Sequence, residues 1–364
     1  MSEKKSVRNY GIDALRIFAM LLVAVLHLLG QGGVLLNPAY RIPTHFAAWM
    51  LEHMALVAVN CFALISGYVG LKAKHRLSGF LMLWLQVFFY SAGIALLFCI
   101  FQPDAVSAED LLHSLLPVSF SQYWYYTAYC GLFLFMPLLN AAVRQMTRMQ
   151  FYLTAGSMIL LFTVSKTFTE RDPFIMHSGY SAFWLIVLYF LGAGIRRFIR
   201  LPRKAIPCCL LIFAAASLWG MLLNGNSVMR LYYDDVPTLT ASLALFFAFS
   251  AMRFRSEAAR GVIGRTAPLT FAVYLTHTHP LVFANILVNR FVRFAQYSVK
   301  HMLASVFLTA SLIFLGSIAV EWVRVRLIRL LHIPQGLAKL DAWLDAEIER
   351  IEQKQRRKRR RSRR

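Results

Sequence analysis

The sequence predicts an all-α integral membrane protein, a bundle of about ten transmembrane helices with both termini in the cytoplasm. Hydrophobic residues make up 58% of the 364 residues, and the mean hydropathy is +0.55. A membrane span needs about 20 predominantly apolar residues, and the chain contains many stretches of that kind. Basic residues gather in alternate connections between these stretches. The composition therefore excludes a soluble globular protein.

Ten stretches are apolar enough to cross a membrane when hydropathy is averaged over about 19 residues. An even number of spans places both termini on one side. The first stretch follows Lys4, Lys5 and Arg8, as in a signal peptide, but it is too long and lacks a small-residue cleavage site. We therefore expect it to be a retained span. The spans are expected near residues 12–35, 46–70, 80–101, 122–142, 150–166, 180–199, 206–224, 236–253, 267–289 and 302–325.

The formal net charge of +22 first suggests a nucleic-acid partner, but the distribution of the 39 Lys and Arg residues argues against one. The long outer connection 102–121 has no Lys or Arg, while it holds Asp104, Glu109 and Asp110. This asymmetry follows the positive-inside rule and places the amino terminus in the cytoplasm. The predicted outer segments hold only Arg41, Lys166, Arg171, Arg230, Arg290, Arg293 and Lys300.

The five cysteines lie in apolar spans, without the spacing of a metal site or of a disulfide framework. We expect them to be packing residues and expect no bound metal. They are Cys61, Cys99, Cys130, Cys208 and Cys209.

The chain divides into a membrane domain, residues 1–330, and a cytoplasmic segment, residues 331–364. In the second part an apolar stripe with helical spacing lies opposite acidic residues that include Asp341, which predicts an amphipathic helix. Eight of the nine residues 356–364 are basic, and such a tail is expected to bind anionic lipid. The stripe consists of Leu337, Leu340, Leu344, Ile348 and Ile351.

The first span holds the most informative pair of residues, Arg16 and His27. Eleven residues return to within roughly 20° of the same helix face and rise about 16 Å, so one stripe carries an arginine near the inner boundary and an imidazole near the membrane centre. Ionisable side chains at that depth usually face a bundle interior or a watery cavity. Neutral imidazole suits proton removal from a hydroxyl, so His27 is a candidate general base. A helix-packing hydrogen bond is the alternative role.

Asp13 lies three residues before Arg16, close enough on a helix to pair with it and to orient the guanidinium towards a phosphate. A snorkelling topology charge is the alternative. Lys72, Lys74 and Arg76 follow the second span on the inner side, where an anionic donor could be bound. Topology alone would also explain that cluster.

Further polar and aromatic residues are candidates for binding a polar acceptor. Glu52 and His53 lie in the outer half of the second span, and Trp124 and Tyr125 open the fourth. His277 precedes Pro280 in the ninth span. The alternatives are an interfacial polar pair, an aromatic belt and a polar contact at a proline kink. Aromatic rings also stack on sugars, so acceptor binding stays open beside these.

Four segments together resemble the membrane acyltransferase 3 family. They are residues 11–16 continued to His27, residues 60–68, residues 123–126 continued to Asn140, and residues 274–277. The first matches that family's pattern of a basic residue, ten residues and a histidine. The resemblance implies transfer of an acyl group, commonly acetyl, from cytoplasmic acyl-coenzyme A to a hydroxyl of a cell-surface glycan or glycolipid.

By the same resemblance His27 is the catalytic histidine, Arg16 is its motif partner, no cofactor is bound, and the protein is a multi-pass protein of a bacterial cytoplasmic membrane. The chain departs from the family at the inner loop, where some members carry an arginine pair and this chain has Lys72, Lys74 and Arg76. It is also too short for the esterase-like domain that some relatives carry.

The sequence thus favours an integral-membrane O-acyltransferase, with acyl-coenzyme A, a surface glycan and anionic lipid as partners. A transporter or lipid-linked glycan flippase is the main alternative, in which the same polar residues would line a translocation path. A scaffold that recruits partners through its basic tail would leave His27 without a role. The acyl group, the acceptor and the oligomeric state are not determined by the sequence.

Overall fold

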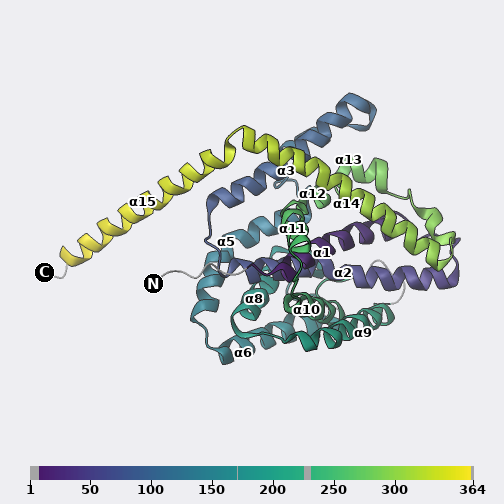
Figure 1. The fold of residues 1–364 in the computed structure, drawn as a ribbon, viewed down its shortest axis with the longest axis horizontal. Helices are drawn as coiled ribbons and strands as arrows, with labels where there is room; N and C mark the ends of the chain where they lie inside the picture. The colour runs from purple at the N-terminus through teal and green to yellow at the C-terminus, as the bar shows by residue number, and fades with distance from the viewer. Residues whose placement is uncertain (1–7, 170, 225–230, 362–364) are drawn as a thin grey trace.

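The computed structural model describes residues 8–169, 171–224 and 231–361, and every regular element in these ranges is helical (Figure 1). Short 3₁₀ and π turns join some of the helices. The helices are α1 Tyr10–Leu29, α2 Ile42–Gly70, α3 Leu77–Phe101, α4 Ala108–Leu115, α5 Trp124–Gln145, α6 Arg148–Ile159, α7 Ser165–Thr169, α8 Ala182–Phe198, α9 Ile206–Asn224, α10 Val236–Ala251, α11 Glu257–Thr266, α12 Phe271–His277, α13 Pro280–Val282, α14 Val299–Leu330 and α15 Ile333–Arg361.

Seven helical stretches of the described chain are long and apolar enough to cross a membrane. The other three predicted spans fall on α8, which has 17 residues, on α10, which has 16, and on a segment from 267 to 289 that is not one continuous helix. Multiple apolar helices are therefore a property of the structure, whereas ten spans and cytoplasmic termini stay predictions.

The ninth predicted span is interrupted directly after His277. Thr278 leaves the helical region with φ −98° and ψ 4°, and His279 caps the short helix α13. Pro280 explains the break, because proline has no N–H to donate and its ring clashes with the carbonyl four residues earlier. A π turn over Phe283–Leu287 then ends the segment. The break leaves His277 at a helix end inside the bundle.

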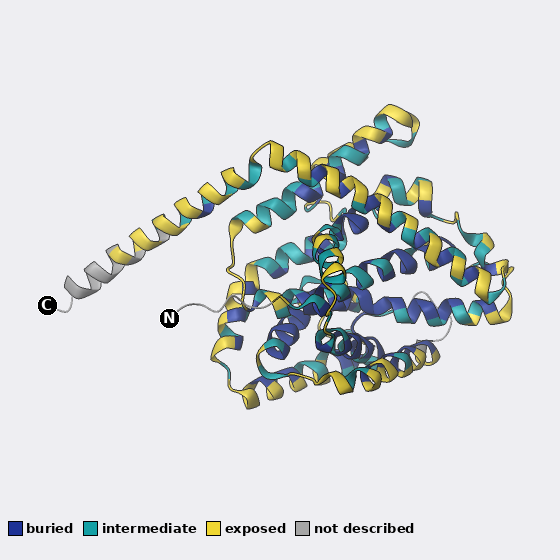
Figure 2. Cartoon of the chain, in the orientation of Figure 1, coloured by how far each residue is buried: buried dark blue, intermediate teal, exposed yellow. Residues whose placement is uncertain are grey.

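The buried residues concentrate on α1, α2, α8 and α10, which form the centre of the bundle (Figure 2). Helices α2 and α8 approach so closely that their backbones touch. A Cβ atom at Gly67 would lie 2.0 Å from the carbonyl oxygen of Tyr189, and one at Gly192 would lie 2.1 Å from that of Leu64. Small residues permit such close helix contacts, and here they fix α2 against its neighbour.

The amphipathic carboxyl-terminal segment forms α15, which leaves the bundle as one long helix (Figure 1). Asp341, which lies opposite the apolar stripe of this helix, is only 8% exposed. Its carboxylate accepts hydrogen bonds from the backbone N–H and the hydroxyl of Ser78. It thereby caps α3, whose own N-cap residue Arg76 provides no side-chain cap. These hydrogen bonds lower the pKa of Asp341.

Candidate active site

The structure places His27 and His277 in direct contact, although 250 residues separate them. Nδ1 of His27 lies 2.8 Å from Nε2 of His277, and the ring centroids are 5.0 Å apart. His277 is buried, and His27 is partly exposed. Phe283, from the π turn after the break, packs its ring edgewise on His27. A buried imidazole therefore supports a more accessible one.

The hydrogen bonds of this pair determine which nitrogen carries each proton. Nδ1 of His277 contacts the carbonyl oxygen of Val273, and a carbonyl can only accept, so this nitrogen is the N–H donor. With both rings neutral, Nε2 of His277 then has the lone pair and accepts from Nδ1–H of His27. Nε2 of His27 is left with a lone pair and has no hydrogen-bond partner among the described residues. This is the protonation pattern of a general base.

Arg16 lies on the same helix as His27, towards the predicted cytoplasmic side. Its Nη1 is 3.6 Å from Oδ1 of Asp13, so the expected pairing is present as a loose ion pair. The other carboxylate oxygen, Oδ2, accepts from Nε of Arg8 at 2.5 Å. The Arg16 side chain is 29% exposed, whereas that of Asp13 is 10% exposed. The guanidinium is thus held by a carboxylate without being saturated by it.

Three cavities meet at Arg16. One of about 440 Å³ is also lined by Lys74 and Arg76, and one of about 210 Å³ by Lys72. The inner basic loop and Arg16 therefore border the same spaces. His75 lines the larger cavity as well, but partial burial lowers its pKa, so it adds no charge there at neutral pH.

The third cavity, of about 270 Å³, leads from Arg16 into the bundle and is called the tyrosine cavity here. Tyr125, Tyr126 and Tyr129 line it together with Phe271. The rings of Tyr125 and Phe271 contact that of Tyr274, at 6.4 and 5.8 Å between centroids. Tyr274 does not line the cavity itself, and it lies one helical turn before His277.

The other acceptor candidates gather on the predicted outer side. The ring of Trp124 is stacked on that of Tyr233, with 5.9 Å between centroids and a 20° angle. Glu52 is buried, and its Oε2 has no partner among the described residues. A Cβ atom at Gly30, three residues after His27, would lie 3.7 Å from Oε1 of Glu52. Glu52 is therefore next to the turn that follows His27.

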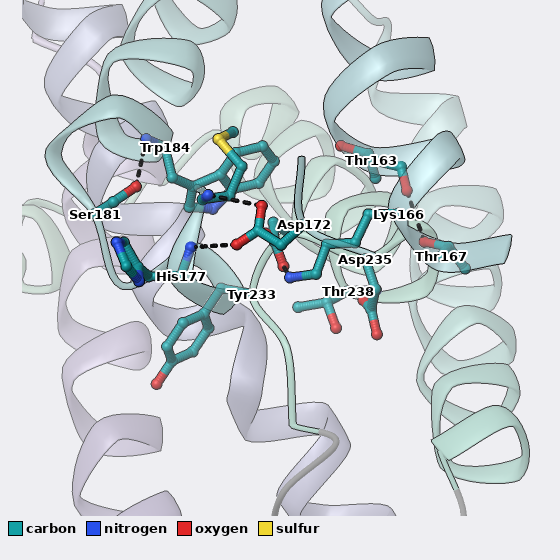
Figure 3. Close-up of polar contacts among 12 residues, drawn as sticks. Thr163, Lys166, Thr167, Asp172, His177, Ser181, Trp184, Tyr233, Asp235 and Thr238 are labelled. Carbon is teal, nitrogen blue, oxygen red and sulfur yellow. Dashed lines mark hydrogen bonds and ion pairs between the residues drawn. The ribbon is translucent and has the colours of Figure 1, made fainter. Parts of the chain in front are cut away.

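His53 is buried, with Nδ1 on the carbonyl of Trp49 and with Nε2 unpartnered among the described residues. A Cβ atom at Gly220 of α9 would lie 3.3 Å from Cδ2 of His53, so the ring packs against α9. Figure 3 shows the polar contacts of the segments before α8 and α10. Lys166 forms an ion pair with Asp234, and the carboxylate of Asp172 accepts hydrogen bonds from the backbone N–H groups of residues 176 and 177. These contacts fix the segment that carries Tyr233. The structure thus does not bring all acceptor candidates to one point.

Sequence reasoning missed a second intramembrane cluster. Glu321 accepts two hydrogen bonds from Arg324, at 2.6 and 2.7 Å, and one each from Gln86 and Tyr90, at 3.0 and 2.9 Å. Gln86 also lines the tyrosine cavity. A carboxylate three residues before an arginine within an apolar stretch was the signal that could have revealed it.

The fold and the site together define a class, a multi-pass helical membrane protein with an oriented imidazole and a basic mouth. A model of the acyltransferase domain of the acyltransferase 3 family matches residues 9–324. The chain belongs to this family and is a membrane acyltransferase. No curated protein and no solved structure matches the chain.

Proposed function

We propose that this protein is an O-acyltransferase that moves an acyl group, most simply acetyl, from cytoplasmic acyl-coenzyme A to a hydroxyl of a cell-surface glycan or glycolipid. The observation that carries the proposal is the hydrogen bond from His27 to His277, which leaves Nε2 of His27 with a free lone pair. General base catalysis needs that lone pair within reach of a hydroxyl.

The reaction then needs one base and no resident cofactor. Nε2 of His27 takes the proton of the acceptor hydroxyl as the hydroxyl oxygen forms a bond to the thioester carbonyl carbon. The C–S bond breaks, and the leaving thiolate receives that proton from His27. His277 is a positioning residue, because it orients His27 and touches no substrate.

Arg16 and the inner loop supply the cationic part of the donor site. Arg16 borders the cavities that hold Lys72 on one side and Lys74 with Arg76 on the other, so each can reach a donor phosphate. The tyrosine cavity continues from Arg16 towards Tyr274 and supports passage of the acyl end to the histidine pair. Glu52 and Trp124, on the opposite side, are suited to bind a polar acceptor.

The test follows label from acetyl-coenzyme A, given to the cytoplasmic face of membranes, into extracted surface glycan. His27→Ala should reduce the initial rate by at least about 100-fold, the lower limit for loss of a general base. His301→Ala is the matched control, because His301 is an exposed histidine of α14 whose only hydrogen bond to a described residue is with Ser298. Equal rates for the native protein and His27→Ala would contradict the mechanism.

A second variant tests the positioning role of His277. His277→Gln should retain the fold and should displace the pH profile of kcat/KM, because that profile reports the protonation of the free enzyme's base. An unchanged profile would contradict the role of His277. Movement of glycan across the membrane without donor consumption would instead favour a transporter.

A further inference from the structure

A second basic cavity lies on the predicted cytoplasmic side. Arg16, Lys72, Lys74 and Arg76 do not line it. Its volume is about 370 Å³, and it is called the arginine cavity here. It forms where the start of α1, the end of α8 and the connection from α10 to α11 meet. Its arginines are Arg8, Arg196, Arg200, Arg253 and Arg260.

Among the described residues that line this cavity, none is Asp or Glu. Arg196 donates to the hydroxyl of Tyr68 at 2.9 Å and lies over its ring, and Arg253 donates to two backbone carbonyls. Arg200 has no hydrogen bond or ion pair with a described residue. Like charges that share one space without a counter-ion repel each other, so the cavity is suited to a polyanion.

Two of the five arginines have carboxylate contacts outside the cavity. Arg8 binds Asp13 at 2.5 Å, and Nη2 of Arg260 is 3.7 Å from the largely exposed Glu257. Neither carboxylate lines the arginine cavity. These contacts orient the two side chains and leave the charge of the cavity strongly positive.

Topology alone would require basic residues on this side but would not require them to line one space. Arg255 shows the difference, because it lies between Arg253 and Arg260 in sequence, is exposed, and does not line the cavity. Arginine binds phosphate in a planar, bidentate manner, which favours Arg over Lys in such a cluster. Tyr10 and Phe254 add aromatic rings that can stack on a base.

The arginine cavity continues into the spaces around Arg16. The cavity of about 210 Å³ shares Arg8, Tyr68 and Arg196 with it and is also lined by Arg16. Arg16 in turn borders the tyrosine cavity. The arginine cavity supplies positive charge and aromatic rings, and the tyrosine cavity supplies space inside the bundle. A long ligand with an anionic nucleotide at one end and a neutral arm at the other fits this arrangement.

We infer that the arginine cavity binds the 3′-phosphoadenosine end of the donor, while the diphosphate lies towards Arg16 and the pantetheine arm continues towards the tyrosine cavity. This inference rests on the proposed function. It assigns donor specificity to Arg200 and Arg253. A coenzyme A derivative that lacks the 3′-phosphate should therefore be a poorer donor.

The first test measures binding without catalysis. Purified full-length protein in a neutral detergent is titrated with adenosine 3′,5′-bisphosphate in a calorimeter. The exposed pair Arg200→Gln with Arg253→Gln should weaken binding by at least about tenfold, and Arg255→Gln should not change it. No binding by the native protein, or equal binding by the double variant, would overturn the inference.

The second test compares acetyl-coenzyme A with acetyl-dephospho-coenzyme A as donors. The native protein should prefer the first in kcat/KM, and the double variant should lose most of that preference while Arg255→Gln keeps it. If both donors serve the native protein equally, the nucleotide site is wrong but acyl transfer stands. If the bisphosphate binds and neither donor is used, the site stands and the proposed function fails.

A lipid headgroup offers the same phosphate chemistry, so the binding test is repeated in nanodiscs with and without phosphatidylglycerol. A nucleotide site predicts the same defect of the double variant in both. Abolition of bisphosphate binding to the native protein by phosphatidylglycerol would assign the cavity to lipid and overturn the inference.

Discussion

Two arginines within apolar helices each follow a carboxylate by three residues, yet the two pairs differ in nearly every other respect. Arg324 and Glu321 make two short hydrogen bonds, and their side chains are 5% and 2% exposed. Arg16 is 3.6 Å from Asp13 and 29% exposed, and it borders three cavities. The same spacing thus gives one closed pair and one open pair.

The difference lies in what else each carboxylate binds. Glu321 receives Gln86 and Tyr90 from α3, so both of its oxygens are saturated from two helices. Asp13 has a second cationic partner, Arg8, which draws one of its oxygens away from Arg16. A closed pair joins helices, whereas an open pair leaves its arginine able to bind a ligand. The two pairs contain the same kinds of residue, an acid and an arginine. They differ in how deeply they are buried and in how many partners each carboxylate has.

The largest effect is expected from breaking the closed pair on one side. Glu321→Ala leaves Arg324 buried without a counter-charge, which costs about 3–5 kcal/mol in comparable pairs. The free energy of unfolding in detergent should fall by that order, and the yield of folded protein should fall with it. Asp13→Ala is the comparison, and an equal loss of stability there would remove the distinction between the two pairs.

Arg16→Gln should affect activity rather than stability. Loss of one charge-assisted hydrogen bond costs about 1.5–3 kcal/mol, so kcat/KM for the donor should fall about 10- to 100-fold while the melting temperature stays close to native. Initial rates at varied donor concentration measure this. A variant that loses stability and activity together would place Arg16 with Arg324 as a structural residue.

Replacing both members of the closed pair should cost less than replacing one. Glu321→Leu combined with Arg324→Leu removes both buried charges, and such replacements are often neutral or stabilising. The double variant should have a higher melting temperature than Glu321→Ala, although Gln86 and Tyr90 lose their acceptor. Equal melting temperatures would show that the hydrogen bonds to α3 contribute more to stability than the ion pair does.

The smallest effect concerns the contact between α15 and α3. Because hydrogen bonds from Ser78 lower the pKa of Asp341, their stabilising contribution is complete above the usual carboxyl range and is lost as pH falls through the lowered pKa. The protection factor of the Ser78 amide, its exchange rate relative to an unstructured peptide at the same pH, should therefore stay high at neutral pH and fall only in acid. Asp341→Asn should lower this protection factor at neutral pH, and an unchanged protection factor would contradict the capping role of Asp341.

Local features of the site were predictable, because they depend on spacing within one helix. The Asp13 and Arg16 pair follows from helical periodicity, and the interruption after His277 was signalled by Pro280. The contact between His27 and His277 was not predictable from one sequence, since it depends on how α12 packs against α1. The burial of Asp341 was not predictable either, because hydropathy describes a helix face and not the partner that covers it.

The hydrogen bond of His277 to Val273 has a consequence for how this enzyme can change. In a catalytic triad a third side chain sets the imidazole tautomer, and substitution of that side chain can tune or destroy the base. In the proposed mechanism a main-chain oxygen of the same helical turn takes that role. No single side-chain substitution can remove this oxygen, so the mechanism predicts that a mutational scan finds two essential histidines and no third member. The helical backbone itself thus keeps the proton of His277 on Nδ1.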